Sequence, residues 1–289
     1  MRHPLRLLFS CLIVVTTVLG LTGCGDDAPP PLRIGSSDDP AMRAAAAVYA
    51  VGLTRAGTPA TTAGAPVGSD AKLMESITTG EVDLFPAFTG DLLTLLSAHP
   101  SAMAGEELLA EVARSLPQGV AVGDPTGVSN RPQLVVSSEL RERYGVATLQ
   151  DCAAFPPGLP LVVVDHDLPV QALSAFEVCR PGPVERVDDV QAVLNRVLTG
   201  QALGVLPALE TAGAAEVHGI SALKSDGAPR AQDLVPVYRS AALGKSALRA
   251  LGRIAGELST ADLAAMADRV ANGEDPGAVA AGWFGGGHS

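Results

Sequence analysis

The chain is poor in aromatic residues, in histidine and in positive charge. Its 289 residues include six Phe, three Tyr, one Trp and five His. Twenty Lys and Arg stand against 31 Asp and Glu, which gives a formal net charge of −11 at pH 7. Because nucleic acid and anionic lipid are held mainly by positive charge, this balance argues against nucleic-acid binding and against adsorption of the folded body to a membrane surface.

Motifs of the common enzyme classes are also missing from the sequence. It contains no G-x-S-x-G, no H-E-x-x-H and no phosphate-binding loop. Away from the chain ends, the histidines are His99, His166 and His218. His166 lies between two aspartates after an apolar stretch, so a hydrolase built around it stays open, although no serine is singled out as its nucleophile. A solvated loop is the alternative for this histidine.

One long apolar run lies near the start of the chain. Arg2 and Arg6 precede the apolar residues 7–21, a pattern typical of a secretory signal and short for a membrane span. The run ends in Leu-Thr-Gly-Cys24, which resembles the bacterial lipobox, where cleavage precedes a cysteine that becomes lipidated. We therefore expect a signal peptide over 1–23, a lipid on Cys24 and a polar, proline-rich tether over 24–31. An ordinary signal peptide or an uncleaved anchor are the alternatives.

Cysteine is scarce in the rest of the chain. With Cys11 in the leader and Cys24 lipidated, Cys152 and Cys179 remain of the four cysteines. In an oxidising compartment we expect a disulfide between them, and closing a loop of this length would stabilise the fold by about 3 kcal/mol. Two buried free thiols are the alternative. No Cys or His spacing suggests a metal, so we expect no metal and no other cofactor.

Short apolar stretches alternate with helical patterns along the remaining sequence, which predicts an α/β fold. The predicted strands are 32–34, 82–85, 133–136, 161–164, 202–206 and 233–239, with 58–67 as a loop or weak strand. The predicted helices are 42–53, 71–79, 91–98, 105–116, 138–144, 149–154, 169–179, 188–198, 245–258, 260–272 and 275–284. Three of these helices have predicted starts: a carboxylate cap in Asp38-Asp39-Pro40, a cap in Ser69-Asp70, and a cap in Ser259-Thr260.

One stretch, G-E-V-D-L-F-P-A-F-T-G over residues 80–90, places two of the few aromatic residues around a proline at the end of a predicted strand. With the lipobox and the Arg-Ile-Gly-Ser of 33–36, it resembles the substrate-binding proteins of glycine betaine, choline and carnitine ABC importers. Looser similarity to that family continues at 130–136, at 144–151 and in the closing segment 272–284. The resemblance covers most of the chain beyond the leader.

The resemblance implies a type II periplasmic-binding-protein fold, in which two α/β lobes are joined by a hinge and close on a ligand in the cleft between them. Lobe one would comprise 32–128 and 234–284, and lobe two would comprise 129–233. The chain would cross between the lobes near Asn130 and near Gln232. A disulfide between Cys152 and Cys179 would then stiffen lobe two without locking the hinge.

The resemblance also implies where the ligand binds. Phe85 and Phe88 stand where the family has tyrosines that surround a quaternary ammonium, and Ser37 stands where it has a lysine. The predicted ligand-binding residues are Ser36, Ser37, Asp38, Phe85, Phe88, Thr89, Asp91, Asn130 and Arg131. Simpler interpretations remain open: Phe85 and Phe88 as core residues, Asp38 and Asp91 as acids favoured at helix N-termini, and Arg131 as a surface residue.

The function implied by the resemblance is a monomeric, lipid-anchored receptor on the extracytoplasmic face of a bacterial cell membrane. It would bind a small quaternary-ammonium or related polar organic solute and deliver it to an ABC permease and its ATPase subunit, so we expect no enzymatic activity and no nucleic-acid partner. The altered aromatic positions leave a second possibility, a degenerate binding domain that acts as a sensor or partner-docking lipoprotein.

Overall fold

The computed structural model describes residues 30–66, 68–165, 173–214, 219–225 and 228–286. The predicted signal peptide, the lipidation of Cys24, most of the tether, and the predictions for His166 and His218 lie outside these residues. From Pro31 onward the chain forms one compact unit. In the described residues no helix has the length and apolar character needed to cross a membrane.

The first five-stranded sheet has the order β2-β1-β3-β10-β4, and its strands come from both ends of the chain. Its strands are β1 (Leu32–Ile34), β2 (Ala60–Thr62), β3 (Leu84–Phe88), β4 (Val120–Val122) and β10 (Leu234–Arg239). Strands β1, β2 and β3 are parallel, whereas β10 runs antiparallel to both β3 and β4. The carboxyl ends of β1, β2 and β3 therefore lie at the same edge of the sheet.

Strand β3 differs from its prediction, because it begins later than Val82 and continues through Pro86 to Phe88. A proline inside a strand lacks one donor for the hydrogen-bond ladder. Here Pro86 lies opposite Pro236 of β10, and hydrogen bonds at the flanking pairs Thr89–Asp233 and Arg239–Asp83 place the two prolines at a non-hydrogen-bonded pair. Neither proline therefore costs a bond between these two strands.

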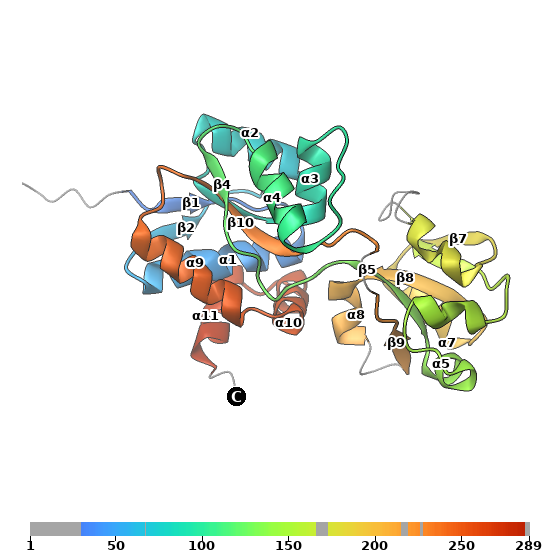
Figure 1. Ribbon diagram of the computed structural model, residues 1–289. Helices are drawn as coiled ribbons and strands as arrows, with labels where there is room; N and C mark the ends of the chain where they lie inside the picture. Colours follow the sequence, from blue (N-terminus) through green and yellow to red (C-terminus); the bar gives the residue numbers. More distant parts are fainter. Residues whose placement is uncertain (1–29, 67, 166–172, 215–218, 226–227, 287–289) are drawn as a thin grey trace, which may run out of the picture. The chain divides into compact units, whose positions relative to one another are not determined.

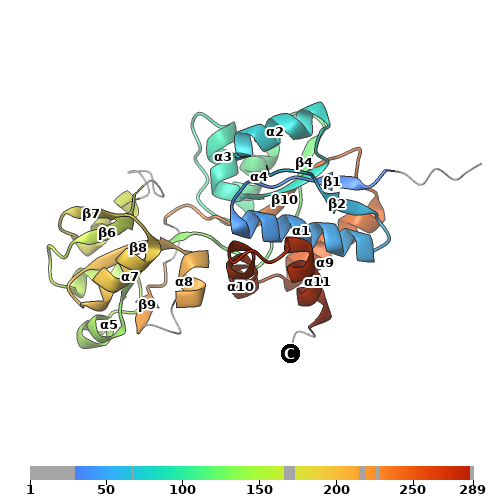
Figure 2. The same ribbon diagram turned by 180° about the vertical axis from the view of Figure 1, so that it is seen from behind.

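Helices cover both faces of the first sheet (Figures 1 and 2). One face carries α2 (Asp70–Thr79), α3 (Thr89–Leu96) and α4 (Gly105–Ser115). The other face carries α1 (Pro40–Arg55), α9 (Lys245–Glu257), α10 (Thr260–Ala271) and α11 (Pro276–Gly285). All of these helices were predicted within a few residues, and the predicted caps at Asp39, Ser69 and Ser259 are confirmed.

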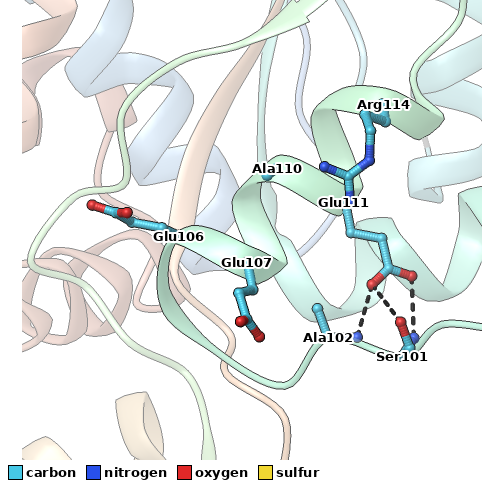
Figure 3. A pocket seen from close by; sticks show the side chains of 7 residues that line it. All are labelled: Ser101, Ala102, Glu106, Glu107, Ala110, Glu111 and Arg114. Atoms are coloured by element: carbon cyan, nitrogen blue, oxygen red, sulfur yellow. Dashed lines mark hydrogen bonds between the residues drawn. The ribbon is translucent and has the colours of Figure 1, made fainter.

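The loop before α4 is fastened by a single carboxylate. Glu111 accepts hydrogen bonds from the backbone N–H of Ala102 at 2.7 Å and of Ser101 at 3.1 Å, and from the Ser101 hydroxyl at 3.0 Å (Figure 3). These bonds hold the pKa of Glu111 below its usual value, because they stabilise the ionised form.

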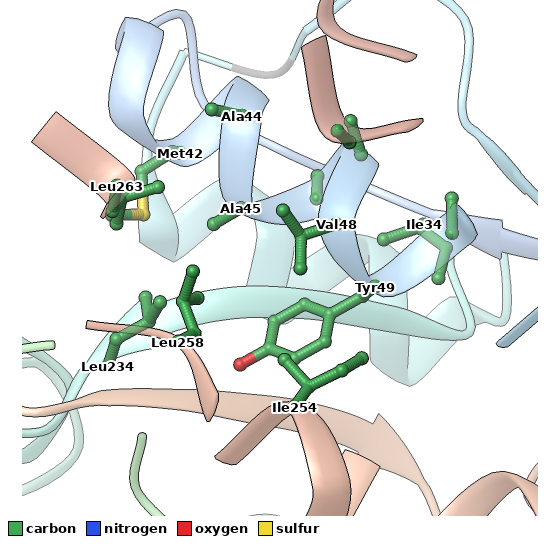
Figure 4. Close-up of a cluster of buried hydrophobic side chains, with 14 of the residues drawn as sticks. Ile34, Met42, Ala44, Ala45, Val48, Tyr49, Leu234, Ile254, Leu258 and Leu263 are labelled. Atoms are coloured by element: carbon green, nitrogen blue, oxygen red, sulfur yellow. The ribbon is translucent and has the colours of Figure 1, made fainter. Parts of the chain in front are cut away.

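Helix α1 is the centre of the first core (Figure 4). Four consecutive alanines, from Ala44 to Ala47, are buried and allow close approach of the surrounding elements. Tyr49 of α1 is 1% exposed beside Ile254 and Leu258, and this burial raises the pKa of its hydroxyl. The carboxyl edge of the sheet is therefore supported by a tightly packed helix that begins at that edge.

The second five-stranded sheet has the order β7-β6-β8-β5-β9. Its strands are β5 (Pro132–Ser137), β6 (Leu161–Val164), β7 (Val184–Val187), β8 (Leu203–Pro207) and β9 (Ile220–Ala222). The helical segments in the same part of the chain are α5 (Ser138–Tyr144), η1 (Gln150–Ala154), η2 (Ser174–Cys179), α7 (Val190–Leu198) and α8 (Ala208–Ala214). Strands β6, β7 and β8 are parallel, and β5 is antiparallel to β8 and β9.

The predicted disulfide between Cys152 and Cys179 is confirmed, and it joins η1 to η2. Both segments are 3-10 helices. The segment η1 agrees within one residue with the short helix predicted over 149–154, and the first residues of the helix predicted over 169–179 lie outside the described chain. Strands β4, β7 and β9 and helix α8 were not predicted. Each of the three strands is only three or four residues long.

Candidate functional site

A cavity of about 540 Å³ opens at the carboxyl edge of the first sheet. In α/β folds this edge is where ligands bind, because loops and helix N-termini converge there. The end of β3 and the segments that follow β1, β2 and β3 contribute some of the lining residues. The others come from Asn130, the end of β8, α8 and α10. The lining residues are Ser37, Asp39, Pro40, Ala41, Met42, Asp70, Phe88, Asp91, Asn130, Pro207, Leu209, Glu210, Ala264, Ala267, Asp268 and Ala271.

The lining contains five carboxylates, a single aromatic ring and no lysine or arginine. Three of the carboxylates belong to the beginnings of helices: Asp39 precedes α1, while Asp70 and Asp91 lie in the first turns of α2 and α3. A carboxylate is favoured at a helix N-terminus by the helix dipole. The helix dipole thus explains why each acid is tolerated at its position, and the sheet topology explains why all three line the same cavity.

Asp39 is held in place by the helix that it caps. Its Oδ1 accepts a hydrogen bond from the Met42 backbone N–H at 3.0 Å. This bond fixes the Asp39 carboxylate at the N-terminus of α1. Ser37 and Met42, on either side of Asp39 in sequence, also line the cavity.

Asp70 is the acid with the most altered titration. Loss of hydration, followed by repulsion from Asp91 and from Asp39, raises its pKa from 3.8 to about 6. Like charges around one cavity disfavour the ionised form of each carboxyl group. The cavity lining therefore concentrates negative charge and contains no lysine or arginine.

Asp91 is tied to the segment that leads into β10. Gln232 donates from Nε2 to Asp91 Oδ1 at 2.7 Å, and its Oε1 accepts the Asp91 backbone N–H at 3.1 Å. Incomplete hydration in the cavity raises the pKa of Asp91, and the hydrogen bond from Gln232 opposes that rise. The backbone of Gln232 also accepts a hydrogen bond from Asn130 N–H at 2.8 Å, so a cavity carboxylate is linked to both chain segments that run between the two sheets.

The two phenylalanines of the G-E-V-D-L-F-P-A-F-T-G stretch lie on opposite faces of β3. Side chains alternate along a strand, so positions three apart point to opposite sides. Phe88 packs with the α1 core, is 8% exposed and lines the cavity. Phe85 is fully buried against α2, α3 and α4, away from the cavity lining.

Four of the nine predicted ligand-binding residues line the cavity: Ser37, Phe88, Asp91 and Asn130. Asn130 Oδ1 accepts the backbone N–H of Leu209 at 3.2 Å and so fixes the start of α8. The other five are not in this lining: Ser36, Asp38, Phe85, Thr89 and Arg131.

Thr89 has a structural task, since its Oγ1 accepts the Asp233 backbone N–H at 3.1 Å and lies 3.4 Å from the Ala231 carbonyl. The next residue, Gly90, allows this close approach, because a Cβ there would lie 2.6 Å from the same carbonyl oxygen. Arg131 lies near Asp233, whose pKa it lowers against a larger rise caused by loss of hydration.

Several lining residues were not predicted as ligand-binding. Asp39 and Asp70 were recognised as helix starts, and the signal that places them in the cavity lining is that their helices, α1 and α2, follow the parallel strands β1 and β2. Helix α10 contributes Ala264, Ala267, Asp268 and Ala271, whose spacing of three and four residues defines one helical face. Glu210 and Leu209 come from α8, which was not predicted.

A second hollow of about 430 Å³ lies along α4 (Figure 3). It is lined by Ser101, Ala102, Glu106, Glu107, Ala110, Glu111 and Arg114. All seven residues belong to one stretch of chain, and Glu111 is occupied in holding Ser101 and Ala102. The cavity at the strand ends is therefore the stronger candidate. In the described residues no group of three or more His, Cys, Asp or Glu side chains could hold a metal ion.

Comparison with known families and structures gives a consistent result. Residues 30–285 match the family described as the substrate-binding domain of ABC-type glycine betaine transport systems. A search of curated proteins finds no match. Apo YehZ from Escherichia coli has a similar structure, with a TM-score of 0.71 and 18% identity over 88% of this chain and 98% of that chain. A glycine betaine/carnitine/choline ABC transporter protein gives a TM-score of 0.73 and 14% identity over 88% and 97%. The likeness to these two structures confirms the predicted type II periplasmic-binding-protein fold.

Proposed function

Because the chain belongs to the family of substrate-binding domains of ABC-type glycine betaine transport systems, we propose that it binds its solute in the cavity at the strand ends of the first sheet. The observation that carries the proposal is the convergence of Asp39, Asp70, Phe88 and Asp91 there, with no lysine or arginine in the lining. Membership of this family also makes the chain a binding protein and not an enzyme.

The solute in this proposal is a small organic cation, of the quaternary-ammonium class or a related polar class. A carboxylate attracts the positive charge, and the face of Phe88 adds a cation–π contact worth about 0.5–2 kcal/mol. Ser37 and Asn130 supply polar groups that orient the solute. The cavity volume lies in the range of about 300–1,000 Å³ that is usual for small-molecule sites.

The wider role in this proposal is that of a lipid-anchored receptor. The leader over 1–23 would be removed, Cys24 would carry the lipid, and 24–31 would tether the domain to the outer face of the cell membrane. The two sheets would form the two lobes of 32–128 with 234–284 and of 129–233, which close on the solute. The loaded protein would then dock on an ABC permease whose ATPase subunit supplies the energy.

Calorimetric titration with glycine betaine, choline, carnitine and ectoine tests the proposed function. We expect saturable binding of at least one cationic solute by the full chain, and a loss of affinity of about tenfold or more in Phe88→Ala, because the ring would be removed from the cavity wall. Phe85→Leu is the matched control: it removes a ring from the same strand but on the other face, so stability should fall while affinity stays the same. If Phe88→Ala and the native chain bind the solute with equal affinity, the solute does not bind in this cavity.

A further inference from the structure

Aspartate side chains already lie at the helix N-termini where the carboxylate of a ligand would be expected to bind. Helix N-termini are natural anion sites, because their first N–H groups have no partner within the helix. Here a protein side chain takes one of those donors at each of three helix starts: Asp39 accepts Met42 N–H, Ser69 accepts Lys72 N–H at 3.4 Å, and Gln232 accepts Asp91 N–H. A zwitterionic solute would bring a carboxylate to three helix starts that are capped by the chain itself.

The local charge balance is negative even after the helix dipoles are counted. Each helix N-terminus carries roughly half a positive charge, whereas each ionised aspartate carries a full negative one. Asp39, Asp70 and Asp91 therefore outweigh the N-termini of α1, α2 and α3 by roughly one and a half charges. Asp268 of α10 adds a further carboxylate to the same cavity. One positive charge on the solute does not balance this set.

The hydrogen-bonding chemistry of the lining favours nitrogen atoms that carry protons. An ionised carboxylate only accepts hydrogen bonds, so it is best satisfied by N–H donors. A quaternary ammonium has no N–H and is normally surrounded by several aromatic faces. This lining has four aspartates and one aromatic ring, Phe88, which is the opposite proportion.

We propose that the cavity takes a solute without a carboxylate that carries two or more protonated amino groups, an aliphatic diamine or polyamine, in preference to glycine betaine or choline. One ammonium group would face Asp39, Asp70 and Asp91, and another would face Asp268, with the aliphatic chain against Phe88 and the alanines of α10. This inference rests on the proposed function, in that it assumes the solute enters this cavity.

The test is a calorimetric titration of the full chain, purified in detergent, with putrescine, spermidine, choline and glycine betaine at pH 7.5. We expect the better of the two amines to bind at least tenfold more tightly than choline, and glycine betaine to bind more weakly than choline. If choline or glycine betaine binds more tightly than both putrescine and spermidine, this inference is overturned and the proposed function stays in place. No binding of any of the four, nor of carnitine or ectoine, would overturn both.

Charge variants locate the amine. Asp268→Asn removes one cavity carboxylate from the exposed face of α10 and should weaken binding of the tighter amine about five- to tenfold while choline affinity changes less than twofold. Glu106→Gln removes the same charge from α4, outside the cavity, and should leave both affinities unchanged. If the two variants lose the same affinity for the amine, only the overall charge of the protein matters. If Asp268→Asn loses no affinity, no second ammonium group lies beside Asp268. Either result contradicts the inference.

Discussion

The two ends of strand β3 carry acids in opposite situations. Asp83, at the amino end, is 8% exposed and accepts hydrogen bonds from Arg33 N–H at 2.9 Å and from Arg239 Nη1 at 2.9 Å. The Arg33 Nε also lies 3.6 Å from its carboxylate. Asp91, just beyond the carboxyl end, shares its cavity with other acids and is bonded to the neutral amide of Gln232.

The difference separates an acid that is paired with arginines in the fold from acids that, in the proposed function, are held for a solute. A buried carboxylate is normally paired with a cation, as Asp83 is. In the part of the chain that the structure describes, Asp39, Asp70 and Asp91 form no ion pair, and loss of hydration, with smaller contributions from repulsion by Asp91 and Asp39, raises the pKa of Asp70. Their cationic partner is, in our account, the solute.

The largest expected effect is on stability at the amino end of β3. Asp83→Asn would leave Arg33 and Arg239 without their shared carboxylate, and we expect the free energy of unfolding to fall by about 2–3 kcal/mol. Urea unfolding followed by circular dichroism measures this change. The matched control is Asp91→Asn, which should cost less than about 1 kcal/mol because no ion pair is lost. Equal losses in the two variants would contradict the distinction.

The next effect concerns the pH dependence of stability. The pKa of Asp70 is raised from 3.8 to about 6 in the folded chain, so the folded state binds a proton more tightly than the unfolded state. The stability that this proton contributes is fully present below pH 3.8 and is lost as pH rises through about 6.

Asp70→Asn removes this titration. Relative to the variant, the native chain should lose about 1–2 kcal/mol of stability between pH 4 and pH 7 in the absence of solute. Unfolding curves at the two pH values measure the difference. Parallel pH profiles for the native chain and the variant would show that Asp70 titrates normally.

The affinity for a cationic solute should change in the opposite direction with pH. Because an ionised Asp70 attracts a cation and a protonated one does not, binding should tighten about fivefold between pH 5 and pH 7.5. Asp70→Asn should flatten this profile, whereas Asp83→Asn should leave its shape unchanged. Titration calorimetry at the two pH values provides the measurement, and an affinity that falls with rising pH would contradict a carboxylate site.

The smallest effect is expected at Gln232. Gln232→Ala removes the donor to the Asp91 carboxylate and the acceptor for its backbone N–H, so stability should fall by about 1 kcal/mol. Since the amide lowers the pKa of Asp91, its loss should move the pH dependence of binding upward. Gln201→Ala, an exposed glutamine between α7 and β8, is the control. An unchanged binding profile in Gln232→Ala would show that the amide does not hold Asp91 for the solute.

Most of the fold was predictable from the sequence, because local signals agree with the final structure. Asp39, Ser69 and Ser259 cap the helices that they were expected to begin, and the apolar run 161–164 forms the buried strand β6. Helix α8 was missed because it is a seven-residue segment that follows Pro207 directly and contains Gly213. Strand β3 was placed too early because Pro86 suggested an end, and its pairing with Pro236 comes from a distant part of the chain.

The site was predictable only in part for the same reason. Phe88 lies in a recognisable stretch and Asp91 directly follows it, so both residues of the cavity lining were among the predicted ones. Asp70 and Asp268 enter the cavity through the parallel arrangement of β1, β2 and β3 and through the packing of α10, which local sequence does not specify. Phe85 illustrates the converse: its position beside Phe88 in sequence suggested a shared role, and the alternation of side chains in β3 places it on the other face.

The most direct test of the account is a crystal structure of the protein with the tightest-binding solute from the titrations. We predict electron density for the solute in the cavity at the strand ends, with a protonated nitrogen at about 2.7–3.2 Å from a carboxylate oxygen of Asp70 or Asp91 and the Phe88 ring within about 6 Å of a cationic group. A solute bound elsewhere, or an anionic group of the solute seated at the starts of α1, α2 and α3, would contradict it.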